Sequence, residues 1–256
     1  MMLLLGAATL LLLLGGGGCS ASAPVGTELA PKRVMLWLGP PAWDHVNKQL
    51  NASQLAATKA NLTKFKDSIT VIGTVGYSID PGSPGFWKPN HPGVEQFNAE
   101  MIKMGFKVHP LIGGLCEDNS VCMKPLCGNL TGNACQIKYF RQIWAKPQPF
   151  IDQAVARIKA GGWDGVNIDF ETGSGTADDA AKFAKFLGLL ADAVHKAGAR
   201  VSVDTNWGPY LNPGTLSQGN TVDTFCDMQT VSPISKRLAS RRPRLPRHID
   251  SAPTPT

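Results

Sequence analysis

Apolar residues recur along the chain in short runs that are rich in β-branched residues and are bounded by glycine and proline. Such runs are typical of buried strands. The predicted strands are 33–38, 68–75, 107–112, 166–171, 200–204 and 223–231. Between several of these runs the apolar pattern changes to a helical period.

Two segments between the predicted strands show this helical period. Residues 151–160 end at Gly161 and Gly162, which favour a helix stop. Further along, apolar residues recur at spacings of three and four: Phe183, Leu187, Leu190 and Val194. Because apolar strands alternate with helices, the pattern predicts an α/β fold in which helices cover a parallel sheet.

The segment 164–171, with the sequence DGVNIDFE, alternates apolar and polar residues. As a strand it would turn its apolar residues toward helices and carry Asn167, Asp169 and Glu171 on the other face. Neighbours in this polar row are ~6.6 Å apart, close enough for Asp169 to hydrogen-bond Glu171. A carboxylate raises the proton affinity of a neighbouring carboxylic acid, and a protonated Glu171 can act as a general acid. A metal site or a buried polar network without chemistry is the alternative interpretation.

Length and composition limit the classes of protein to which the chain can belong. The chain has 256 residues, of which 43% are hydrophobic and 17% charged, which suits one barrel-sized domain or two small ones and excludes general disorder. The net charge is +6, but residues 236–256 hold six basic residues and one acidic residue, and so carry five of these positive charges. A polyanion-binding domain carries its charge on the folded body. Nucleic acid is therefore not an expected partner.

The N-terminus predicts a signal peptide over residues 1–23. A Leu-rich run over 3–14 is followed by four glycines and by Ala21-Ser22-Ala23, which fits a cleavage site. The run is shorter than the ~20 residues that span a bilayer, so no stable membrane span is expected in the mature chain. A lipid anchor on Cys19 is a further alternative.

Three sequons, which begin at Asn51, Asn61 and Asn129, predict N-glycosylation in a secretory route. Together with the signal peptide, they predict a glycoprotein that is secreted or kept in a lysosome-like compartment. The tail over 233–256 is rich in Arg and Pro and lacks apolar periodicity, which predicts disorder. An arm that binds an anionic surface and an out-of-frame C-terminus are the alternatives for this tail.

Four cysteines lie close together in one segment: Cys116, Cys122, Cys127 and Cys135. Their spacings contain no Cys-x-x-Cys and no adjoining pair of histidines, which argues against a zinc site. Two disulfides within a long loop are expected, in a pairing that the sequence leaves open. Cys226 has no evident partner.

The pattern Asp164-Gly165-x-Asn167-x-Asp169-x-Glu171 resembles the signature of the family 18 glycoside hydrolases, Asp-Gly-x-Asp-x-Asp-x-Glu, on the fourth strand of a (β/α)8 barrel. Asn in place of the central Asp, and the segments 203–207 and 225–227, are similar to the branch of the family that contains di-N-acetylchitobiase. The resemblance implies a TIM-type (β/α)8 barrel that is incomplete and C-terminally truncated. About six of its eight strand–helix units would form a catalytic domain over 24–232.

The resemblance also implies a substrate and a mechanism. The substrate class is β-1,4-linked N-acetylglucosamine, in chitin oligosaccharides or in the chitobiose core of N-glycans, and no metal or cofactor is expected. Glu171 would protonate the glycosidic oxygen while the substrate's own 2-acetamido oxygen attacks the anomeric carbon. Asp169 would stabilise the N–H of the resulting oxazolinium ion, in the substrate-assisted exception among retaining glycosidases. Asn167 cannot take up a proton and would donate a hydrogen bond that favours a charged Asp169.

Further residues are predicted to bind the substrate. Trp207, just after the fifth predicted strand, could stack on an apolar sugar face, with the polar Asn206 beside it. Tyr77, near the end of the second strand, could reach the acetamido group. Asp164 either contacts substrate or shapes the turn that begins its strand. The loop 86–91 either lines subsites or is an ordinary Pro-rich loop.

The resemblance is incomplete at the C-terminal end. The family places a Tyr near the end of the sixth strand, where its hydroxyl hydrogen-bonds the acetamido oxygen, but residues 228–231 are Met-Gln-Thr-Val. The seventh and eighth strands also have no counterpart. Two alternatives to a hydrolase therefore stay open: a non-catalytic chitinase-like protein that binds glycans, and an inactive truncated product.

Overall fold

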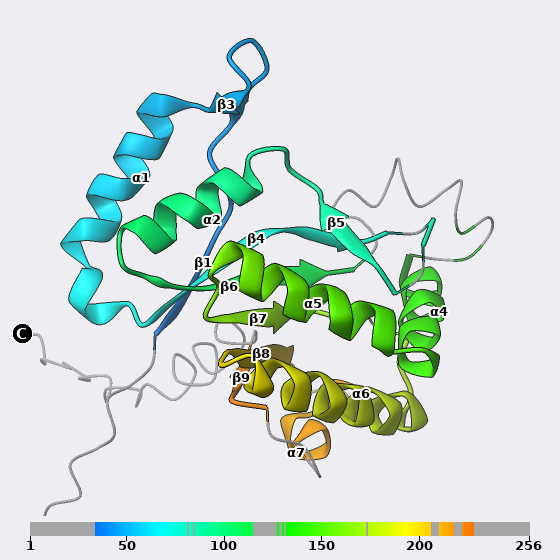
Figure 1. Ribbon diagram of the computed structural model, residues 1–256. Helices are drawn as coiled ribbons and strands as arrows, with labels where there is room; N and C mark the ends of the chain where they lie inside the picture. Colours follow the sequence, from blue (N-terminus) through cyan, green and yellow to red (C-terminus); the bar gives the residue numbers. More distant parts are fainter. Residues whose placement is uncertain are drawn as a thin grey trace, which may run out of the picture. The chain divides into compact units, whose positions relative to one another are not determined.

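The predicted strands form a parallel sheet. In the computed structural model, which describes residues 34–80, 82–83, 85–114, 127, 130, 132–172, 174–205, 210–217 and 222–227, the strand order is β1-β4-β6-β7-β8-β9 (Figure 1). The bounds are β1 (Met35–Leu38), β4 (Val71–Ile79), β6 (Lys107–Gly113), β7 (Gly165–Ile168), β8 (Arg200–Thr205) and β9 (Thr224–Asp227). Neighbours in this order run parallel. The six predicted strands are therefore confirmed in number and order, although residues 228–231 of the last one lie outside the described residues.

Helices connect these strands and pack on one face of the sheet. The described helices are α1 (Ala52–Lys64), α2 (Val94–Lys103), α4 (Gly132–Ala145), α5 (Gln148–Gly161), α6 (Ala177–Lys196) and α7 (Pro213–Leu216), with one 3-10 turn, η1 (Lys66–Ser68). α2 packs on β4 and β6, α5 on β7 and α6 on β8, and these three helices lie in front of the sheet in Figure 1. The arrangement confirms the predicted fold class, an incomplete TIM-type (β/α) barrel.

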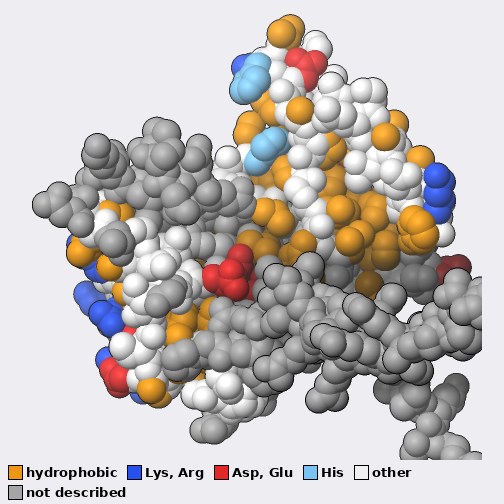
Figure 2. Space-filling view, turned by 180° about the vertical axis from the view of Figure 1, so that it is seen from behind, with side chains coloured by type: hydrophobic (Ala, Val, Ile, Leu, Met, Phe, Trp, Pro, Cys, Tyr) orange, Lys and Arg blue, Asp and Glu red, His pale blue; other side chains and the backbone are white. Residues whose placement is uncertain are grey.

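The sheet curves strongly. Cys226 on β9 and Met35 on β1 belong to the two outer strands of the parallel order, yet the Cys226 Sγ lies 3.7 Å from the Met35 Sδ. Figure 2 shows the molecule from behind, where hydrophobic side chains gather and a group of acidic side chains lies among them. The side of the sheet away from α2, α5 and α6 is thus the inside of the partial barrel.

The predicted ends of helices are confirmed, whereas two strand ends differ from the prediction. α5 ends at Gly161, and Gly162 adopts the left-handed conformation with φ of 65°, which glycine takes without strain. β4 continues past the predicted end at residue 75 to Ile79. β7 stops at Ile168, so Asp169 and Glu171 lie just beyond the strand and not within it.

Two antiparallel pairings have no counterpart among the predicted strands. β2 (Trp43–Asp44) pairs with β3 (Gln49–Leu50) in a separate small sheet. β5 (Trp87–Pro89) pairs with β4 on the main sheet. The segment 86–91 is therefore not an irregular loop throughout, because three of its residues extend the sheet.

One disulfide joins Cys127 to Cys135. It confirms a bridge in the predicted cysteine cluster and decides the pairing of these two residues. Cys116 and Cys122 lie outside the described residues. Cys226 forms no disulfide and is buried.

The start of α6 holds a buried acid in place. Asp179 and Thr176 form a capping box. Arg141 on α4 donates two hydrogen bonds of 2.8 Å to the Asp179 carboxylate, from Nε to Oδ1 and from Nη2 to Oδ2. These hydrogen bonds hold the pKa of Asp179 well below its ordinary value.

Asp179→Asn is expected to lower the free energy of unfolding at pH 7 by about 1–3 kcal/mol. This is less than the about 3–5 kcal/mol for breaking a fully buried pair, because the Arg141 side chain is half exposed. A lowered carboxyl pKa stabilises the folded state above the unfolded pKa of ~3.9, and this contribution is lost as the pH falls further. Urea unfolding at pH 7 and pH 3 measures both effects. A variant that is equally destabilised at the two pH values would contradict this account.

Several predictions concern the chain ends and the sequons. None of the described helices is long and apolar enough to cross a bilayer. The predicted signal peptide (1–23), the tail (233–256) and Asn129 lie outside the described residues. Asn51 caps α1 by accepting a hydrogen bond from the Gln54 backbone N–H, and Asn61 is exposed on the same helix. Glycosylation and localisation stay predictions.

Candidate active site

Asp169 and Glu171 lie together at the end of β7. The Asp169 N–H donates to the Ile112 carbonyl oxygen at 3.0 Å, which extends the β6–β7 ladder by one residue. Both acids are half-buried and line one pocket with a volume of about 160 Å³. The pocket is lined by Tyr77, Ser78, Leu111, Gly113, Gly114, Gln136, Asp169 and Glu171. It therefore lies at the carboxyl ends of parallel strands, where TIM-type barrels carry their active sites.

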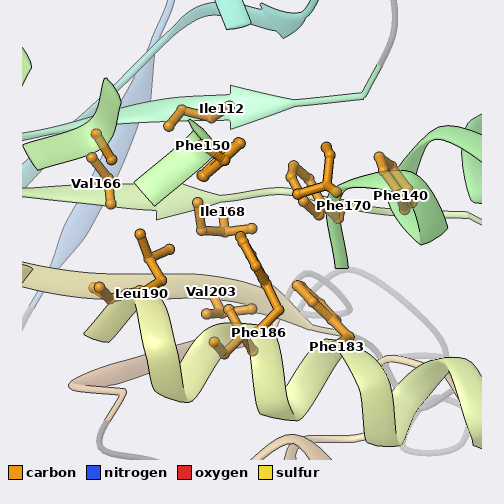
Figure 3. Close-up of a cluster of buried hydrophobic side chains, with 14 of the residues drawn as sticks. Ile112, Phe140, Phe150, Val166, Ile168, Phe170, Phe183, Phe186, Leu190 and Val203 are labelled. Carbon is orange, nitrogen blue, oxygen red and sulfur yellow. The ribbon is translucent and has the colours of Figure 1, made fainter. Parts of the chain in front are cut away.

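Phe170 anchors the segment that carries these two acids. Its side chain is fully buried on the opposite side of the backbone, among aromatic rings from α4, α5 and α6 (Figure 3). The closest ring is that of Phe140, stacked at a centroid distance of 4.5 Å. The other contacting rings are Phe150, Phe183 and Phe186. Since alternate residues of an extended chain point to opposite faces, burying Phe170 turns Asp169 and Glu171 toward the pocket.

Asn167 is the centre of a buried hydrogen-bond network inside the barrel. Its Nδ2 donates to Oδ2 of Asp204 at 2.7 Å, and its Oδ1 accepts from the Ser202 hydroxyl at 2.7 Å. The Ser202 Oγ in turn lies 3.2 Å from the His109 Nδ1. Asn167 and Ser202 are register partners on β7 and β8, which explains their contact. The predicted hydrogen bond from Asn167 to Asp169 stays a prediction, whereas the bond to Asp204 is new.

Asp204 lies near the two acids and was not among the predicted site residues. Its exposed fraction is 0%. Burial, and after it the negative charge of Asp169, raises the pKa of the Asp204 carboxyl group to about 8, although the Asn167 hydrogen bond acts in the opposite direction. The polar alternation of Ser202 and Asp204 within strand 200–204 is the same signal as in 164–171 and was available in the sequence.

Gln136, Gly113 at the end of β6 and the adjoining Gly114 also line the pocket and were not predicted. Gln136 lies on α4, and a Cβ added at Gly114 would come within 3.0 Å of its Oε1. A side chain at position 114 would therefore crowd the pocket wall. No local pattern marks Gln136, because it reaches the pocket from a helix that is distant in sequence from β7.

Tyr77 lines the pocket, but its hydroxyl group, which was predicted to reach the acetamido group, is bound in the helix layer. Its hydroxyl accepts a hydrogen bond from the Asn98 Nδ2 on α2, and the side chain is 1% exposed. The β4–β6 register shifts between Val75 and Tyr77. An extra residue in a strand reverses the face to which the following side chains point. The bulge thus turns Tyr77 into the helix layer.

Asp164, which was also predicted as a site residue, does not line the pocket. Asp164 precedes β7, at the end opposite to Asp169, about 16 Å away for an extended chain. Its backbone pairs with Val108 and Arg200, which agrees with a role in the turn that begins the strand. Trp207 and Asn206 lie outside the described residues. Among the described residues, no three His, Cys, Asp or Glu side chains are grouped as metal ligands would be.

Several solved structures with this fold are chitinases. The chain is similar to a class V chitinase from Pseudomonas fluorescens, with 18% identity and a TM-score of 0.53 over 78% of this chain and 54% of that one. It is also similar to a chitinase from Bacteroides thetaiotaomicron, with 16% identity and a TM-score of 0.52 over 78% and 54%. A family 18 chitinase from Flavobacterium johnsoniae gives 13% identity and a TM-score of 0.50 over 77% and 53%.

These similarities define the fold of the chain. It is the barrel fold of the family 18 chitinases, and the chain spans about half the length of these structures. No protein-family model matches the sequence, and a search of curated proteins finds no match either.

Proposed function

We propose that this protein is a family 18 glycoside hydrolase, nearest the branch that contains di-N-acetylchitobiase, and that it cleaves β-1,4-linked N-acetylglucosamine. The observation that carries the proposal is the shared pocket of Asp169 and Glu171 at the carboxyl end of β7. The chitinase-type fold supports it. The substrate is a chitin oligosaccharide or the chitobiose core of an N-glycan, reached through the secretory pathway.

In the proposed mechanism the two acids act at different atoms. Glu171 donates its proton to the glycosidic oxygen as the bond from that oxygen to the anomeric carbon breaks. The acetamido oxygen of the same sugar forms the new bond to the anomeric carbon, and the carboxylate of Asp169 accepts a hydrogen bond from the oxazolinium N–H. Water then attacks the anomeric carbon as the bond from that carbon to the acetamido oxygen breaks, and gives a proton to Glu171, so the product retains its configuration.

Asp169 and Glu171 can perform these steps because the structure holds them firmly. Phe170 lies between them in the chain and is packed among four rings, so the backbone of the segment has little freedom. A group held in the reactive geometry before the reaction needs no reorganisation during it. Both side chains are also partly shielded from water, which strengthens their charge interactions.

The proposal is tested with two trisaccharides that differ in the acetamido group. The full chain is expected to hydrolyse tri-N-acetylchitotriose and to leave cellotriose intact, because only the first carries the internal nucleophile. Proton NMR of the anomeric signals should show the β-anomer as the first product. Hydrolysis of both sugars, or release of the α-anomer first, would contradict the mechanism. Binding of tri-N-acetylchitotriose without turnover would indicate a glycan-binding protein instead.

A further inference from the structure

Asp204 lies behind the two acids of the pocket, on the neighbouring strand. It points to the inside of the barrel, since Val201 and Val203 of the same strand pack in the hydrophobic cluster with the helices. The Asn167 amide holds it: the amide oxygen is bound by Ser202, so the Nδ2 group faces Asp204. The amide therefore has one orientation, which presents a donor to the Asp204 carboxyl group.

Among the described residues, the groups that face Asp204 form no ion pair that would stabilise its ionised form. From the β7 side it faces the acids Asp169 and Glu171. From the β9 side it faces the thiol of Cys226, whose pKa burial raises to about 12, so the thiol stays neutral. On the β6 side the His109 ring contacts the Ser202 hydroxyl, which donates to Asn167. In the described part of the chain, none of the ion pairs involves Asp204.

A buried carboxylate without a cation is unfavourable, and two acidic neighbours add to the cost. We propose that Asp204 is a positioning residue of the candidate active site: its buried carboxyl group carries a proton at neutral pH and so leaves the negative charge on Asp169, beside Glu171. This inference rests on the proposed hydrolase function. It gives a role to the Asn167 amide, which cannot take up a proton. The amide instead fixes the position of the Asp204 carboxyl group by a hydrogen bond.

The proton on Asp204 matters for the chemistry because charges in the cluster are coupled. When Asp204 ionises, its proton passes to solvent and two negative charges face each other in the barrel interior. Their repulsion disfavours the position in which the Asp169 carboxylate stabilises the oxazolinium ion. Hydrolysis therefore needs a proton on Asp204 as well as on Glu171, and two ionisations remove activity at high pH.

The first test compares the pH dependence of kcat/KM for tri-N-acetylchitotriose in the full chain and in Asp204→Asn. Above about pH 8, where Asp204 ionises, the logarithm of kcat/KM of the unmodified chain should fall with a slope approaching −2. The Asn variant, which stays neutral, should fall with a slope of −1. A purely structural role for Asp204 would leave the two slopes equal. Equal slopes would therefore overturn the positioning role.

The second test needs no catalysis. A carboxyl group whose pKa is raised on folding stabilises the folded state fully below the unfolded pKa of ~3.9, and this contribution is lost as the pH rises toward about 8. The urea midpoint of the unmodified chain should therefore fall between pH 4 and pH 8 relative to that of Asp204→Asn. Asp192→Asn, the same change at an exposed position on α6, is the matched control and should keep the pH dependence of the unmodified chain.

These two tests separate the inference from the proposed function. A chain without hydrolytic activity at any pH would overturn the proposed function and the positioning role together, while the urea series would show whether Asp204 still holds its proton. A constant difference between the midpoints from pH 4 to pH 8 would overturn the inference alone. If Asp204→Asn does not fold, the protonation of Asp204 is followed in the unmodified chain by carbon-13 NMR of the Asp carboxyl groups as the pH is raised. Absence of any Asp carboxyl that titrates above pH 6 would then contradict the proposal.

Discussion

Replacing Glu171 by Gln is expected to lower kcat/KM for tri-N-acetylchitotriose by about 10²–10⁴-fold, the usual contribution of a general acid. Gln has nearly the same shape as Glu but has no proton to donate to the glycosidic oxygen and cannot accept one from water. The substrate would still fit the pocket, so its dissociation constant, measured by isothermal titration calorimetry, should change little. The loss would therefore appear in kcat and not in binding.

Glu95→Gln is the matched control for this experiment. Glu95 lies on α2, pairs with Arg157 and does not line the pocket. The same chemical change there should leave kcat/KM within about two-fold, since surface substitutions rarely have large effects. A Glu171→Gln variant that keeps more than a third of the activity would exclude Glu171 as the proton donor. Equal losses in both variants would point to a general effect of charge.

Phe170→Ala is expected to lower the free energy of unfolding by about 3–5 kcal/mol, the range for truncating a buried Phe. The ring is fully buried and contacts four other rings, so its loss leaves a cavity that rigid neighbours cannot fill (Figure 3). Equilibrium unfolding in urea measures the change. Activity under folding conditions should fall as well, because the backbone that carries Asp169 and Glu171 loses its anchor.

Phe65→Ala serves as the control, because Phe65 is 61% exposed. Its truncation should cost at most about 0.5 kcal/mol, as is usual for exposed positions. Phe170→Leu should lie between the two, because Leu refills part of the cavity but cannot stack on Phe140. If Phe170→Ala were as mild as Phe65→Ala, the ring cluster would not be what positions the two acids.

The strands were predictable from the sequence because buried strands show a local pattern of apolar residues. The runs at 107–112 and 200–204 match β6 and β8 almost residue for residue. Helix ends at Gly162 and Gly198 were predictable for a similar reason, since only glycine takes the left-handed conformation easily. α1 and α2 were not predicted, because their apolar faces are short and their packing on the sheet stabilises them more than their periodicity suggests.

The candidate site likewise has residues that were predictable from the sequence and residues that were not. Asp169 and Glu171 were predictable, because alternation along one extended segment places them on one face and their spacing suits acid–base chemistry. The direction of the Tyr77 hydroxyl group was not predictable, because the bulge in β4 depends on how β4 pairs with β6 and not on the residues of β4 alone. The hydrogen bond from Asn167 to Asp204 joins two strands that are distant in sequence, so it needs the register of β7 with β8.

The amino-acid sequence alone determined the alternation of strands and helices and the common face of the two acids in the segment that follows β7. It could do so because both properties depend on residues within a few positions of one another. Only the tertiary structure decided which residues surround those acids, which cysteines pair, and that Asp204 shares their buried interior. Those contacts depend on the register and curvature of the whole sheet, which arise when segments distant in sequence pack against each other.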